Sequence, residues 1–301
     1  MEKTVRETIK EIVFKHLKTK KYKAYGQCLS AVGWVGGTLP ELYEKDGMVE
    51  LSMADVAGGG IVVGAALAGD RPIYVIRYQG FNWFNCPIIL NYACKSKEIW
   101  KIPCPIFIRG IAMEGGIGPV AGSSHHSLYH RMPGVKIASP MTPKEYKKVY
   151  QEFMKDDSVY YVSEHRGSYG NKEEIKDINK KDPDVTFFSI SITRFEAIKA
   201  AKILKKEKIN VNFFNLLWLK PFKIKQNWIR SINNSKISFI FDDDYRDGIS
   251  STLAHKLMSK SEKKVIPLGL KDKSAGFSKD RDNLPPSANE IVGLVKKFLK
   301  N

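Results

Sequence analysis

The sequence predicts an α/β protein of two domains, on three observations. The chain has 301 residues, more than the roughly 250 at which a single hydrophobic core begins to stop growing. In two separate stretches, short apolar runs alternate with segments of helix length, which is typical of parallel sheets covered by helices. Between these stretches, residues 167–184 are polar and charged. We therefore expect a first domain at 1–170 and a second at 184–301.

The elements of the first domain follow from the spacing of its apolar residues. It begins with a charged amphipathic helix whose apolar face consists of Val5, Ile9, Ile12 and Val13. A glycine-rich segment at 26–38, a helical segment at 39–47 and a helix of small residues after Ser52 come next. Buried strands are then expected at 71–78, 104–110, 134–140 and 158–166. The helices between them are expected at 85–100 and 142–156.

The same alternation starts again after the polar connection. Apolar runs bounded by polar residues predict strands at 185–191, 209–221, 237–244 and 263–270. Amphipathic segments predict helices at 193–208, 248–260 and 287–300. These elements predict a second, smaller parallel sheet with helices packed on it.

Composition excludes several classes of function. The net charge of +17 comes from lysines scattered through helical segments, so we expect no nucleic-acid binding. No apolar run reaches the roughly 18 residues of a membrane span, and we expect no membrane association. The N-terminal segment lacks the apolar core of a signal peptide, and its glutamates argue against a transit peptide, so we expect a cytoplasmic protein. The four cysteines lack metal-ligand spacing, so no metal site is expected on this chain.

The stretch "SMADVAGGGIVVGAALAGDRPI" at 52–73 combines an acidic residue with a glycine-rich apolar run. Ser52 and Asp55 have the spacing of a capping box, which predicts that their side chains start the helix. The glycines allow close packing against neighbouring backbone, so this helix is expected to be buried or at an interface. Neither GxGxxG nor GxxxxGK[ST] occurs in the context of a phosphate-binding loop.

The order of motifs carries a resemblance to a known family. "SMADVAGGGIVVGAALAGDRPIYV", "YQGFNWFNCPIILNYACK" and "GGIGPVAGSSHH" resemble the pyrimidine-binding domain of thiamine-diphosphate enzymes. They are most similar to the β subunits of 2-oxoacid dehydrogenase E1 components, and more distantly to the C-terminal half of transketolases. "NLLWLKPF" and "FDDDYRDGISSTLAHKLM" are similar to the C-terminal domain of the same enzymes. The resemblance implies a doubly wound parallel-sheet domain that binds the pyrimidine, followed by a smaller transketolase C-terminal-type α/β domain.

The resemblance assigns Asp55 to the position of the family's catalytic acid. In the family an acidic residue, usually glutamate, hydrogen-bonds the aminopyrimidine ring at the start of the small-residue helix. A carboxylic acid is needed there to share a proton with the pyrimidine nitrogen. This lets the exocyclic amine of the cofactor become an imine, which then removes the thiazolium proton. Aspartate is one methylene shorter than glutamate, by roughly 1.5 Å. Asp55 therefore keeps this role only if the helix lies closer to the ring; otherwise activation is weaker.

The resemblance also places three aromatic residues at the cofactor. Tyr78, Phe81 and Phe84 correspond to the family's aromatic platform for the aminopyrimidine, on which a ring stacks readily. Phe81 is the main candidate. The alternative is ordinary core packing at a turn between a strand and a helix.

The resemblance aligns the glycine-rich loop at 110–124, and the residues that follow it, with the family's loop that carries an active-site histidine. The residues Ser124, His125 and His126 are similar to the Thr-His-Gln of transketolase-like relatives. Histidine suits the task because it exchanges protons with a substrate near neutral pH. The stretch from His125 to Pro133 is several residues shorter than in those relatives, so the assignment stays open between His125, His126 and His130. The stretch "SEHR" at 163–166 ends a later strand, where it is expected either to bind a carboxylate or phosphate or to form an interdomain ion pair.

Other features of the family predict a partner. Its enzymes hold Mg²⁺ and the diphosphate with a GDG motif followed by an asparagine, and neither "KDG" at Lys45 nor "RDG" at Arg246 fits this pattern. The resemblance therefore implies that thiamine diphosphate is shared with an α-type subunit, which carries the diphosphate-binding domain and the Mg²⁺. Two such pairs are expected to form an α2β2 heterotetramer.

Three functions are consistent with these residues. The main hypothesis is a β-like subunit of a thiamine-diphosphate enzyme that decarboxylates a 2-oxoacid and transfers the acyl or aldehyde unit. A second is a split transketolase or carboligase subunit that transfers a two-carbon ketol unit from a ketose phosphate. A third is a non-catalytic scaffold subunit of the same fold, which Asp55 and the short histidine loop would favour.

Overall fold

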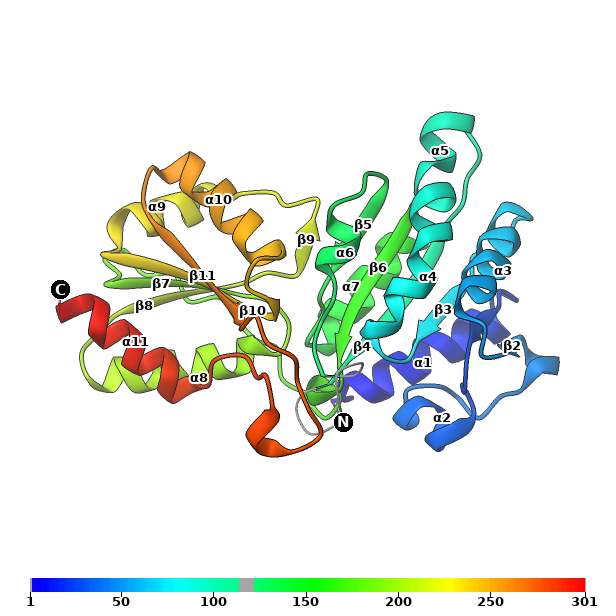
Figure 1. Ribbon diagram of the computed structural model, residues 1–301, viewed down its shortest axis with the longest axis horizontal. Helices are drawn as coiled ribbons and strands as arrows, with labels where there is room; N and C mark the ends of the chain where they lie inside the picture. The colour runs from blue at the N-terminus through cyan, green and yellow to red at the C-terminus, as the bar shows by residue number, and fades with distance from the viewer. Residues whose placement is uncertain (1, 114–121, 301) are drawn as a thin grey trace. The chain divides into compact units, whose positions relative to one another are not determined.

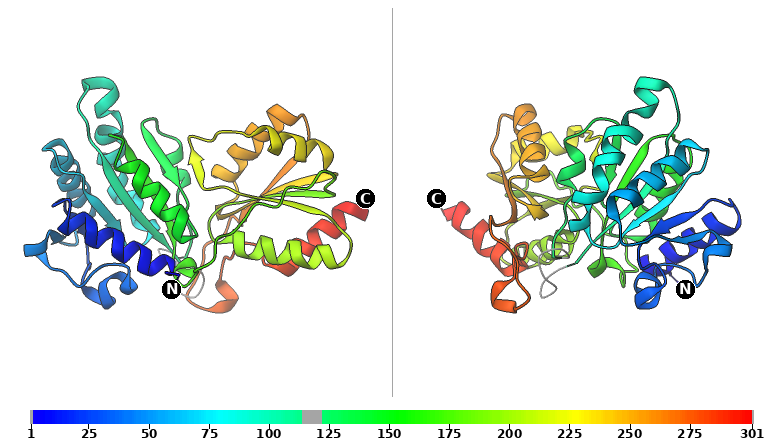
Figure 2. Two further views of the ribbon diagram at one scale, coloured as in Figure 1. Left: turned by 180° about the vertical axis from the view of Figure 1, so that it is seen from behind. Right: turned by 45° about the vertical axis from the view of Figure 1, so that its right-hand side comes forward.

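The computed structural model describes residues 2–113 and 122–300 (Figure 1). The described chain divides into two compact units, of which the first ends at Glu174 and the second begins at Ile175. Each unit is a parallel sheet with helices on both faces (Figures 1 and 2). No helix among the described residues is both long enough and apolar enough to span a membrane.

The strands of the first unit run in the order β2-β1-β3-β4-β6-β5, and each neighbouring pair is parallel. Their bounds are β1 Ala24–Gly26, β2 Met48–Glu50, β3 Ile73–Ile76, β4 Ile106–Ala112, β5 Val135–Ala138 and β6 Val159–His165. Every residue of β3, β4 and β6 is buried, which matches their nearly continuous apolar sequences. The strand order reverses at β1, since β2 lies on one side of it and β3 on the other.

Helices cover both faces of this sheet, with α1 and α7 on one side and α3 to α5 on the other (Figures 1 and 2). Their bounds are α1 Val5–Lys18, α2 Ala31–Gly37, α3 Asp55–Leu67, α4 Asn82–Ile88, α5 Cys94–Trp100, α6 Ser127–His130 and α7 Pro143–Phe153. The π-helical segment Ile89–Ala93 joins α4 to α5, so the expected helix at 85–100 is confirmed. In α2, positive φ angles from Val32 to Gly36 make the turn left-handed.

Two local predictions for this unit were wrong. The segment 39–47 forms only the short 3₁₀ turn Glu44–Asp46, because Tyr43 is extended and its backbone N–H donates to the Asp46 carboxylate, a local bond that competes with a helix. The capping box at the start of α3 is absent as well. The N-cap of that helix is Ala54, whose backbone N–H donates to the Ser52 carbonyl, and it makes no side-chain capping bond. The Asp55 side chain has other partners, described below.

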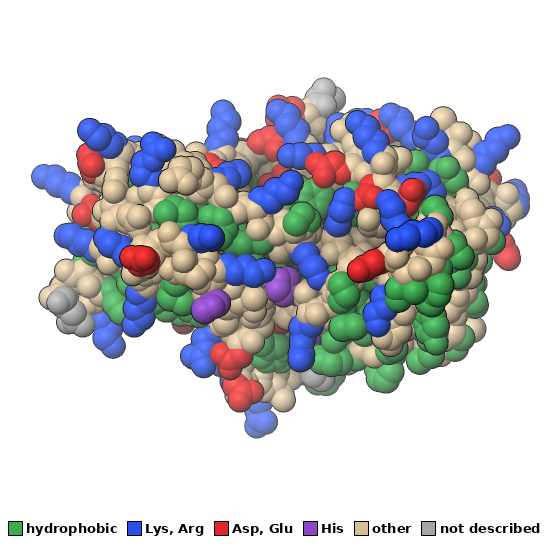
Figure 3. Space-filling view, turned by 90° about the horizontal axis from the view of Figure 1, so that it is seen from above, with side chains coloured by type: hydrophobic (Ala, Val, Ile, Leu, Met, Phe, Trp, Pro, Cys, Tyr) green, Lys and Arg blue, Asp and Glu red, His purple; other side chains and the backbone are tan. Residues whose placement is uncertain are grey.

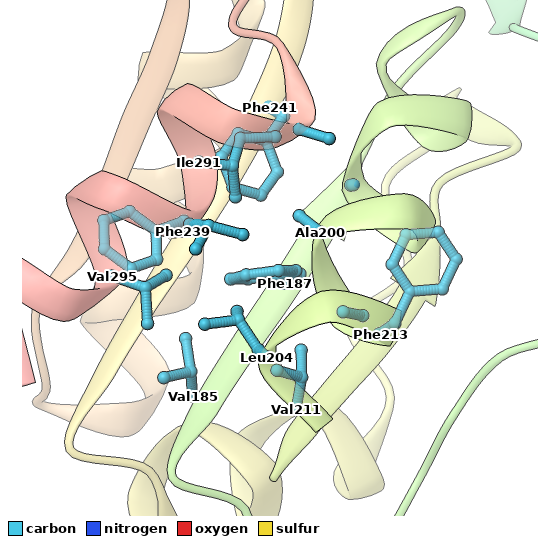
Figure 4. Packing of buried hydrophobic residues seen from close by; sticks show 14 residues of the cluster. Val185, Phe187, Ala200, Leu204, Val211, Phe213, Phe239, Phe241, Ile291 and Val295 are labelled. Atoms are coloured by element: carbon cyan, nitrogen blue, oxygen red, sulfur yellow. The ribbon is translucent and has the colours of Figure 1, made fainter. Parts of the chain in front are cut away.

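The second unit is built on a smaller parallel sheet in the order β11-β10-β7-β8. The four strands of this sheet are β7 Val185–Ser189, β8 Val211–Asn215, β10 Ile237–Tyr245 and β11 Val265–Leu270. The short strand β9 Trp218–Lys220 is not part of it. The helices of this unit are α8 Thr193–Lys206, α9 Gln226–Asn234, α10 Ile249–Ser261 and α11 Ala288–Lys300. Phenylalanines of β7, β8 and β10 pack against α8 and α11 in its core (Figure 4).

The short helix α9 was not predicted. Its nine residues are mostly polar, and only a few turn inward. The apolar residues Trp228 and Ile232 are both buried. Their spacing of four residues was the available signal, but two positions are too few to establish a helical period.

Buried histidines make the stability of the fold depend on pH. His16 in α1 is fully buried and pairs with the Tyr150 hydroxyl at 2.9 Å, and burial lowers its pKa to about 4. Burial likewise lowers the pKa of His165 to about 3. In the unfolded chain each histidine binds a proton near pH 6.5, whereas in the folded chain it does so only near pH 4 or 3. The free energy of unfolding therefore decreases as the pH falls from about 6.5 toward these values.

We therefore expect the free energy of unfolding to fall by about 3 kcal/mol from His16 alone between pH 6.5 and 4. Urea titrations at several pH values measure this slope. In a His16→Gln variant the slope is expected to decrease, because the amide does not titrate and still reaches Tyr150. An identical slope in the variant would contradict the assignment.

Candidate active site

A cavity of about 170 Å³ lies at the carboxyl ends of β1 and β3, where the strand order reverses. Ligands of open α/β sheets bind at such a switch point because the loops after the two strands diverge there. The cavity is lined by residues that follow β1, by the start of α3 and by the turn after β3. The residues are Gln27, Cys28, Met53, Asp55, Tyr74, Val75, Ile76, Arg77, Tyr78, Phe81 and Asn85.

Two amide side chains hold the carboxylate of Asp55. Its Oδ1 atom accepts hydrogen bonds from Gln27 Nε2 and Asn85 Nδ2, each at 3.1 Å. Asn85 is held in turn, because its Nδ2 donates to the Phe81 carbonyl at 2.9 Å and its Oδ1 accepts from the Tyr74 hydroxyl. Burial, and then the charge of Asp55, raises the pKa of Tyr74, so this hydroxyl stays protonated and able to donate. We call the two side chains that hold Asp55, Gln27 and Asn85, the amide clamp.

The clamp depends on a close approach of α3 to α4. A Cβ atom at Gly59 would lie 2.7 Å from the Asn85 carbonyl oxygen, a distance that no side chain tolerates. Glycine at this position therefore allows Asn85 to reach Asp55. At Gly60 and Gly64 an added Cβ would meet no atom within 4 Å. The close packing expected of the glycine-rich helix is thus confirmed at Gly59, while its other face is open.

The aromatic candidates separate into two groups. Tyr78 and Phe81 both line the cavity, and their ring centroids lie 6.2 Å apart. Phe84 lies outside the cavity lining, and its side chain is 55% exposed on the outer face of α4.

The histidines are connected to this region through Gln79. This buried side chain donates from Nε2 to the Ser163 hydroxyl at 2.9 Å and to the Gly110 carbonyl at 3.1 Å. Its Oε1 accepts the backbone N–H of His125 at 2.6 Å. His126 is fully buried, with Nδ1 3.0 Å from the same Ser163 hydroxyl. Gln79 thus joins the turn after β3 to the histidine loop.

The three histidine candidates differ in their surroundings. His125 is half-buried, and its Nε2 lies 3.0 Å from the Ser123 hydroxyl. His126 is enclosed, as described above, and His130 is half-buried at the end of the short helix α6. None of the three is among the described residues that line the Asp55 cavity. Residues 114–121 of the preceding loop lie outside the described residues.

The sequence did not point to Gln27, Gln79 or Asn85. Each carries an amide side chain, and an isolated glutamine or asparagine has no spacing signal comparable to that of a capping box or a metal site. Gln27 directly follows β1 and Gln79 lies three residues after the end of β3, at the strand ends where α/β proteins gather functional side chains, and this was the available clue.

Together these features define a two-unit α/β protein with a carboxylate in an aromatic-lined cavity at its switch point. The model of the family described as transketolase, pyrimidine binding domain, matches residues 13–172, and that of the transketolase C-terminal domain matches residues 173–285. The chain belongs to the transketolase pyrimidine-binding domain family. The family resemblance and the fold class predicted from the sequence are confirmed.

The chain is similar to several characterised subunits. It is 25% identical over 283 residues to the pyruvate dehydrogenase E1 component subunit beta of Rickettsia bellii, with 86% of each chain covered. Identity to the acetoin:2,6-dichlorophenolindophenol oxidoreductase subunit beta of Cupriavidus necator is 24%, covering 90% of this chain and 86% of the other. Identity to the 2-oxoisovalerate dehydrogenase subunit beta of Bacillus subtilis is also 24%, over 76% of each chain.

Solved structures share the fold. A structure described as a split gene transketolase, inactive beta4 tetramer, superposes with a TM-score of 0.76 over 100% of this chain and 99% of the other. Its sequence identity is 16%. Transketolase from Campylobacter jejuni gives a TM-score of 0.73 at 15% identity, over 97% of this chain and 46% of the other.

Proposed function

We propose that the protein is a β-like subunit of a thiamine-diphosphate enzyme that decarboxylates a 2-oxoacid and transfers the resulting acyl or aldehyde unit. The observation that carries the proposal is the clamped Asp55 carboxylate, which faces a cavity lined by Tyr78 and Phe81. The similarity to β subunits of 2-oxoacid dehydrogenases, over 76% to 86% of this chain, supports the same reaction class.

The cavity fits the aminopyrimidine part of the cofactor. Its volume of about 170 Å³ exceeds the roughly 150 Å³ that accommodates a six-membered ring such as benzene. Aromatic side chains at 78 and 81 offer faces for stacking, and the Asp55 carboxylate offers a polar group for a ring nitrogen. The cavity thus provides both kinds of contact that a polar heterocycle requires.

In this proposal Asp55 exchanges a proton with the pyrimidine ring. When bound, thiamine diphosphate supplies the nucleophilic carbon that attacks the 2-oxoacid. The amide clamp holds Asp55 through Oδ1, and no described residue donates a hydrogen bond to Oδ2. Positioning by two donors compensates for the shorter aspartate side chain, because a fixed carboxylate needs no reorganisation when it reacts. We assign proton exchange with the substrate to His125 or His126.

An exposed apolar surface supports the proposed α-type partner. Large hydrophobic side chains, each at least 46% exposed, project from the outer faces of α3, α4 and α5. They are Val56, Ile61, Leu67, Trp83, Phe84, Tyr92, Ile99 and Trp100. Figure 3 shows hydrophobic side chains gathered on the first unit, at the right of the view. Contiguous exposed apolar surface marks a protein interface.

We infer that the partner binds this surface, holds Mg²⁺ and the diphosphate, and completes an α2β2 assembly. The isolated chain is then expected to bind thiamine diphosphate weakly, and the mixture with its partner tightly. Calorimetric titration of each measures the difference. Full activity of the isolated chain would overturn this proposal. A substrate screen with 2-oxoacids and ketose phosphates separates decarboxylation from transfer of a two-carbon ketol unit.

The clamp gives a second test. We expect Asn85→Leu to reduce kcat of the assembled enzyme by at least about tenfold, because Asp55 loses a donor and the isosteric leucine cannot hold it. Gln27→Leu is expected to have a similar effect. Asn91→Leu, on the same helical segment and exposed, is the matched control. A kcat for Asn85→Leu equal to that of the control would show that the clamp has no role in turnover.

A further inference from the structure

Two arginines lie at the carboxyl edge of the first sheet, beside the Asp55 cavity. Arg77 directly follows β3 and Arg166 directly follows β6, and both strands pair with β4. Both side chains are half-buried and line one small cleft, together with Tyr78. Arg77 and Tyr78 also line the Asp55 cavity, so the cleft and the cavity adjoin.

Neither guanidinium has a carboxylate partner among the described residues. Arg77 lies over the ring of Tyr78, with 5.6 Å from its Cζ atom to the ring centroid. Arg166 donates from Nη1 to the Met113 sulfur at 3.0 Å, a weak acceptor. By contrast, two other buried or half-buried arginines of this unit are paired with carboxylates, Arg109 with Glu164 and Arg71 with Asp157.

The surroundings of the two arginines favour an anion. The remaining walls of the cleft come from α2 and β4 and include Val32, Val35 and Ile111. Partial burial of two positive charges against apolar side chains costs free energy unless a negative group accompanies them. The same low polarity strengthens any ion pair that forms there. The cleft has a volume of about 10 Å³, roughly that needed for one water molecule, so it admits one oxygen of an anionic group whose remaining atoms lie outside it.

We propose that Arg77 and Arg166 bind an anionic group of the substrate, a carboxylate or a phosphate, while its reacting carbon lies in the Asp55 cavity. This inference rests on the proposed function and adds a residue pair that sets substrate class. Arginine suits the task because its planar fork matches the oxygens of both groups. The positive pair selects against uncharged carbonyl substrates.

Arginine-specific modification by phenylglyoxal tests the site without turnover. The full chain is treated with the reagent in the presence of inorganic phosphate or pyruvate, and mass spectrometry follows each arginine. We expect one of the two anions to slow modification of Arg77 and Arg166, and the protecting anion identifies the group as phosphate or carboxylate. The exposed Arg230 serves as the internal control. Equal modification rates with and without both anions would overturn the proposal.

Steady-state kinetics of the chain assembled with its α-type partner provide a second test. Arg77→Gln and Arg166→Gln are expected to raise KM for the protected class of substrate by at least about tenfold, with a smaller change in kcat. Arg230→Gln is expected to leave KM unchanged. If both variants form an active complex with an unchanged KM, the anion site is refuted while the proposed function stands. Protection by an anion in a chain that never supports thiamine-diphosphate turnover would instead refute the proposed function and leave the anion site standing.

Discussion

The Asp55→Asn variant is expected to lose activity by a factor of about 10² to 10⁴, the range that one positioned acid or base contributes. Asparagine keeps the shape of the side chain and can still contact Gln27, but it cannot exchange a proton. The change replaces one cavity-lining side chain and none of the exposed apolar side chains, so assembly with the partner should persist. The measurements are kcat of the complex and its mass in solution.

Two further variants sharpen this prediction. Asp55→Ala should also abolish turnover and spare assembly, while Asp55→Glu tests the reach of the acid. If the clamp compensates for the short side chain, the added methylene misplaces the carboxylate and lowers kcat. Asp247→Asn, on an exposed residue of the second unit, is the control. A rate within twofold of wild type for Asp55→Asn would favour the non-catalytic scaffold.

The Glu164→Gln variant is expected to destabilise the protein by about 3 to 5 kcal/mol, as the loss of one partner of a buried ion pair does. Glu164 receives Arg109 Nε at 2.7 Å and Nη2 at 2.9 Å, and both residues are buried. It also accepts the hydroxyls of Tyr146 and Tyr169. Burial by itself lowers the pKa of Arg109, but Glu164 raises it, so the guanidinium stays charged. Without Glu164, a buried charge lacks its counter-ion.

Denaturant unfolding of the isolated chain measures this loss. The control is Glu207→Gln, which removes the exposed pair with Lys296 and should cost less than about 1 kcal/mol. Similar midpoints for the two variants would show that the buried pair does not stabilise the first unit.

Most helices and strands could be predicted because their apolar residues recur at regular intervals over many positions. The strands β3, β4 and β6 are uninterrupted apolar runs, and α1 and α7 are amphipathic. Where the signal was short, as in α9, or where a local hydrogen bond from the backbone to a side chain favoured a turn, as at 39–47, the prediction failed. The pairing of Arg109 with Glu164 joins residues 55 positions apart. No local pattern reveals such a contact.

The candidate site was predictable only in part. The family resemblance led to Asp55, Tyr78 and Phe81, which the structure brings to one cavity. It did not lead to the amide clamp, because Gln27 and Asn85 lie about 30 residues from Asp55 on either side. Gln27 reaches Asp55 from the segment after β1, and Asn85 reaches it through the packing of α3 on α4. The geometry of Gly59 sets that packing, and it is visible only in three dimensions.

The position of Gln79 has a consequence for motion. One side-chain amide is hydrogen-bonded to the histidine loop through His125 and to the sheet through Gly110 and Ser163, while its own backbone belongs to the aromatic turn. Neither segment can move away from the sheet without breaking bonds to the same buried amide. The turn that carries Tyr78 and Phe81 and the start of the histidine loop therefore share a single local unfolding equilibrium. Access to the cofactor side and access to the substrate side of the site are opened by one event.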